Sequence, residues 1–219
     1  MDIFTGTRGF IFDCDGTLLD SMPAWNACEA ELERLAGATF TEDQLEELRA
    51  ASITEAARIF HERYGIGRSA EDVLRMEDEM LLDLYRTEVG AKPGARDLLA
   101  YAGERSIPCT VVTSSPLRYV RAGLQRNGLT AYLREICTTD ELNTSKQEPG
   151  IYEHAMATMG STPETTWGFD DAVYAIRVME SMGIRAIGAY DCNETGAYEN
   201  LAAAATMIVR SLSELVPAE

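Results

Sequence analysis

Asp13 and Asp15 are the residues of this chain whose types and spacing indicate chemistry most clearly. They follow the apolar run Phe10–Phe12, which predicts a buried strand, and they precede a Gly-Thr turn. Side chains at alternate positions of an extended segment point the same way, so we expect neighbouring carboxylates at the strand's C-terminal tip. Two close carboxylates repel unless a cation or a shared proton relieves them, and Mg²⁺ prefers oxygen ligands. A turn with two solvated acids is the alternative.

The longer string around these acids is more specific than the pair alone. It reads Phe-Ile-Phe-Asp-Cys-Asp-Gly-Thr-Leu-Leu-Asp over residues 10–20. This Asp-x-Asp-Gly-Thr-Leu-x-Asp pattern after an apolar strand resembles the first motif of the haloacid dehalogenase-like superfamily. The resemblance implies three further motifs: an apolar strand that ends in Ser or Thr, a Lys before a helix, and an apolar strand that ends in two acids.

Each of the three implied motifs has a counterpart downstream. Members of this family usually have Pro directly after the Lys. This chain has Gln147 at that position and Pro149 two residues later. Four motifs in this order and separation make the chain similar to the family over essentially its whole length. The residues concerned are Thr113 with Ser114 after the strand 109–113, Lys146 before a predicted helix, and Asp170 with Asp171 after the strand 166–169.

The resemblance implies the chemistry of phosphate monoester hydrolysis. Asp13 would attack phosphorus and form an aspartyl-phosphate, which divides one difficult step into two. Asp15 would protonate the departing alkoxide and then take a proton from the attacking water. A halide leaving group needs no proton and the founding dehalogenases lack this second Asp, so its presence favours phosphate esters. We therefore expect a Mg²⁺-dependent phosphatase that acts on a small phosphorylated metabolite.

The resemblance also implies which residues bind the metal and the phosphate. Mg²⁺ would lie between Asp13 and the phosphate, with Asp171 and the backbone carbonyl of Asp15 as further ligands. Asp170 would either share the metal or support Asp171, and the sequence leaves both alternatives open. The residues implied for phosphate binding are Thr113, Ser114 and Lys146.

Composition limits the partners and the compartment. A formal net charge of -17 argues against nucleic acid and against an anionic membrane surface. The five cysteines are scattered, odd in number and without zinc-binding spacing, so we expect reduced thiols in a cytoplasmic protein. The first residues lack a secretory pattern, and the longest apolar stretch, over 201–209, is too short to span a bilayer. We expect His61 and His154 to be structural or surface residues.

Alternating strands and helices predict an α/β fold, a doubly wound Rossmann-like parallel sheet with an inserted α-helical cap domain. We assign residues 1–19 and 90–219 to the core domain and 20–89 to the cap. The cap pattern predicts helices over 23–36, 42–50 with Thr41 as N-cap, 54–64 and 70–85. The core pattern predicts strands over 109–113, 135–138, 166–169, 186–190 and 206–209, and helices over 95–104, 117–127, 151–159 and 173–182.

Two other functions stay open at this level. A β-phosphoglucomutase-like sugar phosphomutase would share the motifs and the cap, but such mutases have His where this chain has Trp25 and a cap Arg where it has Ile53. A catalytically idle interaction module on the same scaffold is the other alternative, because fold does not determine function. The sequence has no pattern that selects one substrate or an oligomeric state.

Overall fold

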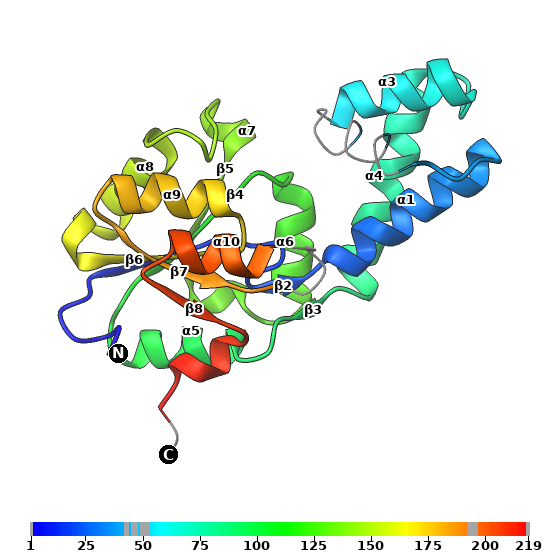
Figure 1. The fold of residues 1–219 in the computed structure, drawn as a ribbon. Coiled ribbons are helices and arrows are strands. Elements are labelled where there is room, and N and C mark those ends of the chain that lie inside the picture. The colour runs from blue at the N-terminus through cyan, green and yellow to red at the C-terminus, as the bar shows by residue number, and fades with distance from the viewer. Residues whose placement is uncertain (1, 42–43, 45–47, 49–52, 192–196, 218–219) are drawn as a thin grey trace. The chain divides into compact units, whose positions relative to one another are not determined.

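A parallel sheet of six strands forms the centre of the larger part of the chain (Figure 1). The computed structural model describes residues 2–41, 44, 48, 53–191 and 197–217. The strand order is β5-β4-β1-β6-β7-β8, and every pairing is parallel, which confirms the predicted fold class. The strands are β1 (Gly9–Phe12), β4 (Cys109–Thr113), β5 (Leu133–Thr138), β6 (Thr166–Asp170), β7 (Arg185–Ala189) and β8 (Met207–Val209).

The chain divides into two compact units. The core unit comprises Met1–Ser21 and Val89–Glu219, and the helical unit comprises Met22–Glu88. The assignment of residues 20–89 to a substrate-selecting cap stays a prediction. No helix within the described ranges is long and apolar enough to cross a membrane.

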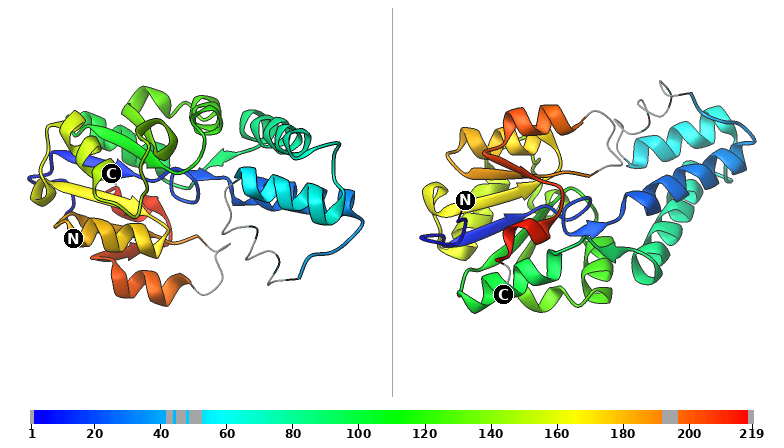
Figure 2. Two further views of the ribbon diagram at one scale, coloured as in Figure 1. Left: turned by 90° about the horizontal axis from the view of Figure 1, so that it is seen from above. Right: turned by 60° about the horizontal axis from the view of Figure 1, so that its bottom comes forward.

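Helices cover both faces of the sheet in the core unit, as right-handed crossovers require. On one face, α8, α9 and α10 share a buried cluster with sheet residues such as Ile11 and Val112. Figure 2 shows α5 and α6, in green, on the opposite face. These helices are α5 (Ala95–Glu104), α6 (Leu117–Arg126), α8 (Gly150–Met159), α9 (Val173–Ser181) and α10 (Ala197–Ala204).

The register of the central strands brings their C-terminal ends to one edge. Phe12 is paired with Val111 of β4 on one side and with Phe169 of β6 on the other. The rings of Phe12 and Phe169 stack at 4.3 Å between centroids, in a strand pair with no exposed residue. Because the residues that follow these strands are the predicted site residues, the sheet gathers them at one place.

Most predicted elements of the core unit are present, with ends that differ by one or two residues. The exceptions are α10, which none of the predicted ranges covers, and several short elements without a periodic pattern of their own. Strands β2 (Leu19–Asp20) and β3 (Gly90–Ala91) form an antiparallel pair where the chain leaves and re-enters the core unit. A short helix, α7 (Thr139–Leu142), and 3-10 turns at Thr130–Tyr132, Pro163–Thr165 and Leu212–Leu215 were not predicted either.

The helical unit contains α1 (Met22–Ala36), α3 (Ile53–Tyr64) and α4 (Ala70–Thr87). Their apolar spacing predicted them because each buries one stripe of side chains. In α4 the buried positions are Val73, Glu77, Leu81 and Tyr85, four residues apart. The helix predicted over 42–50 lies largely outside the described residues.

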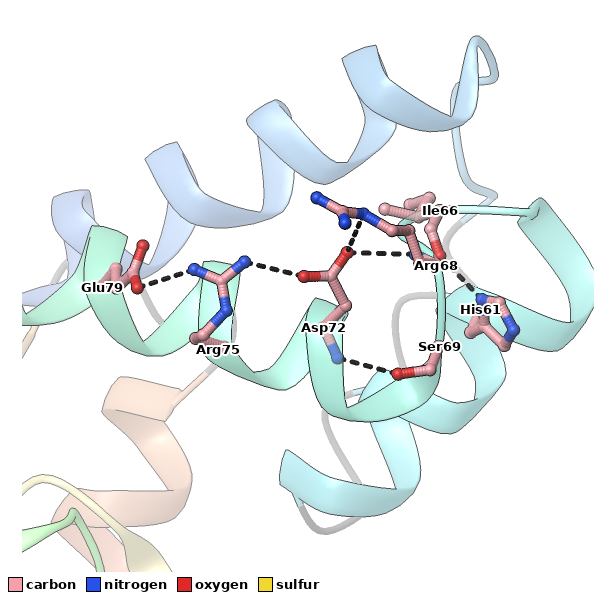
Figure 3. Close-up of polar contacts among 7 residues, drawn as sticks. All are labelled: His61, Ile66, Arg68, Ser69, Asp72, Arg75 and Glu79. Atoms are coloured by element: carbon pink, nitrogen blue, oxygen red, sulfur yellow. Dashed lines mark hydrogen bonds and ion pairs between the residues drawn. The ribbon is translucent and has the colours of Figure 1, made fainter.

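A polar network on the helical unit fixes the start of α4 (Figure 3). Ser69 is the N-cap, and its hydroxyl accepts from the backbone N–H of Asp72 at 3.2 Å. The Asp72 carboxylate accepts from Arg75 at 2.7 Å, and Arg75 also donates to Glu79 at 2.8 Å. His61 Nδ1 donates to the carbonyl of Ile66 at 2.9 Å, so it carries the proton and has the structural role expected from the sequence.

Candidate active site

Three buried carboxylates and one buried lysine meet at the C-terminal edge of β1 and β6. Carboxylate oxygens of Asp13, Asp170 and Asp171 all lie within 4.8 Å of one another, and we call these residues the acid cluster. The backbone N–H of Asp13 donates to the carbonyl of Phe169 at 2.8 Å, which continues the β1–β6 ladder to the site. Two strands far apart in sequence therefore hold the acids together.

Lys146 is the cation of this site. Its Nζ lies 2.7 Å from Asp13 Oδ1 and 2.6 Å from Asp170 Oδ2, and its side chain is only 4% exposed. The hydroxyl of Tyr152, in α8, donates to the backbone carbonyl of Lys146 at 2.9 Å. The loop before α8 is thus anchored to that helix, and the ammonium group bridges the first and last motifs.

The ionisation of the site follows from burial and close charges. The pKa of Asp13 is raised to about 7, mainly by burial; the charges of Asp170 and Asp15 act in the same direction, and Lys146 acts against them. Burial by itself lowers the pKa of Lys146, but Asp13 and Asp170 raise it well above its ordinary value. The lysine stays charged, and it offsets only part of the negative charge of its neighbours.

The acid cluster fits a hard divalent cation. Asp13 Oδ2 is buried and has no hydrogen-bond partner among the described residues, while Oδ1 of the same carboxylate is held by Lys146. An unpaired carboxylate oxygen in a buried site is costly unless a cation binds it. The donors are all oxygens, which Mg²⁺ prefers over softer metals.

Asp170 and Asp171 have different surroundings although they are adjacent. Asp170 Oδ1 accepts from the backbone N–H of Ala172 at 2.9 Å, and its Oδ2 contacts Lys146, so both oxygens have a protein partner. Asp171 faces the turn after β1: a Cβ placed at Gly16 would overlap Asp171 Oδ2. Gly16 also has φ of 86°, so both the backbone and the available space require glycine there.

Asp15, two residues after Asp13, lies in a tight turn. The N–H groups of Leu18 and Leu19 donate to the carbonyl of Cys14 at 2.9 and 2.8 Å, and Gly16 N–H donates to Leu19 at 2.9 Å. The Cys14 thiol between the two acids is fully buried, and burial together with Asp15 and Asp13 raises its pKa well above the ordinary value. Cys14 is therefore a neutral packing residue.

Thr113 and Ser114 end the neighbouring strand β4. Thr113 is buried, and its hydroxyl accepts from the backbone N–H of Ser115 at 3.0 Å, which shapes the turn after the strand. Ser114 is exposed at the tip of the strand. The structure thus places both predicted phosphate-binding residues at the sheet edge that carries the acid cluster.

The sequence interpretation missed one ion pair close to these residues. Asp191 follows β7, its side chain is fully buried, and its Oδ2 lies 3.0 Å from Lys92 Nζ. Asp191 also borders the space above Gly16, 3.5 Å from a Cβ placed there. The position of Asp191 directly after the predicted strand 186–190 was the one signal that the sequence offered.

Comparisons with known proteins agree with the motifs. A sequence model of the family described as haloacid dehalogenase-like hydrolase matches residues 10–189. The phosphorylated carbohydrates phosphatase of Thermotoga maritima is 25% identical over 177 residues, which cover 81% of this chain and 82% of that protein. Hexitol phosphatase A of Escherichia coli is 29% identical over 166 residues, which cover 75% of this chain and 74% of that protein.

A solved structure shares the fold along nearly the whole chain. It is CbbY from Rhodobacter sphaeroides in complex with phosphate, with a TM-score of 0.78 and 23% sequence identity. The match covers 95% of this chain and 96% of that one. At this level of identity, the likeness shows a common fold.

Proposed function

Because the chain belongs to the haloacid dehalogenase-like hydrolase family, we propose that it is a Mg²⁺-dependent phosphatase that hydrolyses a small phosphate monoester through an aspartyl-phosphate. The observation that carries this proposal is the state of Asp13. One oxygen of its carboxylate is held by Lys146 at 2.7 Å, and the other is buried without a partner in the described part of the chain. A fixed carboxylate beside further acids is suited to attack an electrophile that a cation neutralises.

Asp13 is the nucleophile of the proposed reaction and Asp15 its general acid and base. Asp13 attacks phosphorus while Asp15 gives a proton to the leaving alkoxide, so the ester bond breaks as the acyl-phosphate bond forms. Asp15 then removes a proton from water, which hydrolyses the aspartyl-phosphate and releases inorganic phosphate. The influence of Asp15 on the pKa of Asp13 supports this pairing, because it requires the two carboxylates to be close.

Asp13 and Asp171 are the proposed side-chain ligands of Mg²⁺, and the carbonyl of Asp15 is the proposed backbone ligand. Bound Mg²⁺ supplies charge neutralisation for the transferring phosphoryl group. We assign Asp170 the supporting role, since Ala172 N–H and Lys146 already engage its two oxygens. The sequence left open whether Asp170 shares the metal or supports Asp171, and these two contacts support the second alternative.

Lys146, Thr113 and Ser114 are the proposed phosphate-binding residues. The ammonium group of Lys146 is buried and charged, so it can stabilise negative charge on the phosphoryl oxygens without reorganisation. Thr113 and Ser114 add a hydroxyl and backbone N–H groups at the end of β4. This local grip is needed because the net charge of -17 repels an anionic substrate at longer range.

The substrate class we propose is a small phosphorylated metabolite such as a sugar or polyol phosphate. The names of the relatives, a phosphorylated carbohydrates phosphatase and a hexitol phosphatase, support that class. We propose that the helical unit, residues 22–88, is the cap that selects among such substrates. A cytoplasmic location is supported by Cys14, Cys28, Cys109 and Cys137, which are free and buried.

We propose a phosphatase in preference to a phosphomutase because of the helical unit. Trp25, where the mutases have His, donates from its indole N–H to the hydroxyl of Tyr85 at 3.0 Å and packs within that unit. Ile53, where they have Arg, begins α3, and its side chain lies outside the described residues. Conversion of β-glucose 1-phosphate to glucose 6-phosphate without phosphate release would favour the mutase.

Phosphate release from a panel of phosphorylated metabolites tests the proposed function. The purified chain is assayed with Mg²⁺, with chelator, and as Asp13→Asn, and a generic aryl phosphate serves as the reference substrate. We expect release that needs both Mg²⁺ and Asp13. No release from any compound would favour the idle interaction module.

A further inference from the structure

Outside the acid cluster, the described chain brings together one carboxylate, one thiol and one imidazole. Glu135 and Cys137 occupy alternate positions of β5, so their side chains leave the same face of the strand. His154 lies on α8, which packs on that face. One ligand atom from each residue lies within 4.8 Å of the other two, and His154 Nε2 is 3.3 Å from Glu135 Oε1.

We propose that Glu135, Cys137 and His154 form a second metal site, which binds a borderline-soft divalent cation of the zinc class. The donors are one oxygen, one sulfur and one nitrogen, a set typical of Zn²⁺ and poorly suited to Mg²⁺. Three protein ligands leave a fourth tetrahedral position for water. The sequence shows no zinc-binding spacing because the ligands come from a strand and a helix that only the fold brings together.

The exposure of the three side chains is suited to a site that takes up a cation from solvent. Cys137 is 3% exposed, so its sulfur lies in the core next to apolar residues of α8. The side chains of Glu135 and His154 are 38% and 40% exposed, so a cation can reach them directly. Glu141, at the end of α7, adds a second carboxylate near Cys137.

The thiol must lose its proton when the cation binds. Burial raises the pKa of Cys137 to about 12, and Glu135 and Glu141 contribute in the same direction. The sulfur is therefore a neutral thiol without metal, and binding of the cation forms the metal–sulfur bond as the proton passes to solvent. The affinity for the cation should accordingly rise with pH.

A cation here would join β5 to α8, the helix that supports Lys146. His154 is two residues from Tyr152, whose hydroxyl holds the Lys146 carbonyl at 2.9 Å. The metal would thus stabilise the edge strand β5 and the helix α8, and α8 holds the loop that carries Lys146. Such a site is structural or regulatory, and it shares no ligand with the acid cluster on β1 and β6.

Cobalt spectroscopy tests the site directly. Co²⁺ is titrated into the full chain with Mg²⁺ in excess, so that the acid cluster is occupied by the harder ion. We expect a near-ultraviolet thiolate-to-cobalt charge-transfer band and intense visible bands of a four-coordinate ion, both abolished by added Zn²⁺. Oxygen ligands alone give no thiolate band, so the signal separates this site from the acid cluster.

Ligand variants and matched controls complete the test. Cys137→Ser should abolish the charge-transfer band, and His154→Ala and Glu135→Gln should weaken Zn²⁺ binding by more than the roughly 10–100-fold that loss of a partner of a metal ligand costs. The controls Cys109→Ser and His61→Ala should keep the band. Circular dichroism checks folding, and the half-exposed Glu135 and His154 keep the test valid if Cys137→Ser misfolds. No charge-transfer band in the wild type, or a band that survives Cys137→Ser, would overturn the proposal.

Discussion

Lys146 and Arg75 each contact two carboxylates, but in opposite surroundings. Lys146 lies 2.6 and 2.7 Å from two members of the acid cluster, with 4% of its side chain exposed. Arg75 lies 2.7 and 2.8 Å from Asp72 and Glu79, with 56% exposed. Exposed ion pairs are screened by water and contribute little to stability. Buried charges cost stability, and they are found most often at functional sites. Similar contact lengths therefore belong to the proposed reaction centre in one unit and to a helix surface in the other.

Replacement of the proposed nucleophile should show the largest difference between the two regions. Asp13→Asn keeps the shape of the side chain but cannot attack phosphorus, so we expect turnover to fall by on the order of 10⁴-fold or more. Asp72→Asn, which changes a carboxylate beside Arg75, is the matched control and should keep wild-type turnover. Steady-state phosphate release by both variants, with folding checked by circular dichroism, makes the measurement. Near-wild-type activity of Asp13→Asn would remove Asp13 from the nucleophilic role.

Metal removal should have the next largest effect. We expect exhaustive chelation to lower turnover by roughly 10²–10⁴-fold, the equivalent of several kcal/mol of charge stabilisation, and Mg²⁺ to restore it. Ca²⁺ should inhibit, because it takes more ligands at longer distances and disturbs in-line geometry. Asp171→Asn should weaken Mg²⁺ binding in calorimetry, whereas Asp72→Asn on the exposed network should leave it unchanged. Full activity after chelation would exclude the metal from the mechanism.

Replacing the two cations compares the regions most directly. Lys146→Met leaves buried carboxylates without their cation, so we expect turnover to fall about 10²–10³-fold and stability to fall by roughly 3–5 kcal/mol. Arg75→Met should change neither the activity nor the melting temperature appreciably, since Glu79 is 64% exposed and Asp72 keeps the backbone N–H of Arg68 as a partner. Phosphate release and denaturant unfolding at neutral pH measure both effects. Equal losses in the two variants would mean that burial does not separate the regions.

Glu77 is a third case, a buried carboxylate for which α4 supplies no cation. Its Oε2 has no hydrogen-bond partner among the described residues, and burial raises its pKa from 4.5 to about 7. The folded state therefore holds the proton more tightly, so stability falls as the pH rises from about 4.5 to 7 and stays lower above that range. We expect Glu77→Gln to be more stable than wild type at pH 8 by about 1–3 kcal/mol, and the gain to shrink towards pH 5.

Urea unfolding at pH 5 and pH 8 measures this effect, with the fluorescence of Trp25 as a probe in the helical unit. Glu79→Gln is the matched control, because Glu79 lies on the same helix with its side chain 64% exposed. Its unfolding should follow the wild-type pH dependence. If Glu77→Gln also followed the wild-type pH dependence, the buried carboxylate of Glu77 would not be the source of the loss of stability between pH 5 and pH 8.

Local patterns predicted the elements that carry the site. The helix Ala95–Glu104 has the predicted ends, and the strand Cys109–Thr113 likewise. The spacing of apolar residues in each element, and the residues that mark its two ends, lie within its own sequence, which is why both could be predicted. The two-residue strands β2 and β3 could not, because they exist only through their pairing with each other across the helical unit.

The sequence alone determined the family, the α/β class and which acids follow which strands, because each depends on residue types at short spacing. Only the tertiary structure decided that Lys146 holds one oxygen of Asp13, 133 positions away, and that the other oxygen has no hydrogen-bond partner in the described part of the chain. It also decided that Asp191 pairs with Lys92, and that Glu135 and Cys137 face His154. The physical reason is that these distances depend on strand register and helix packing, which join residues that no local pattern relates.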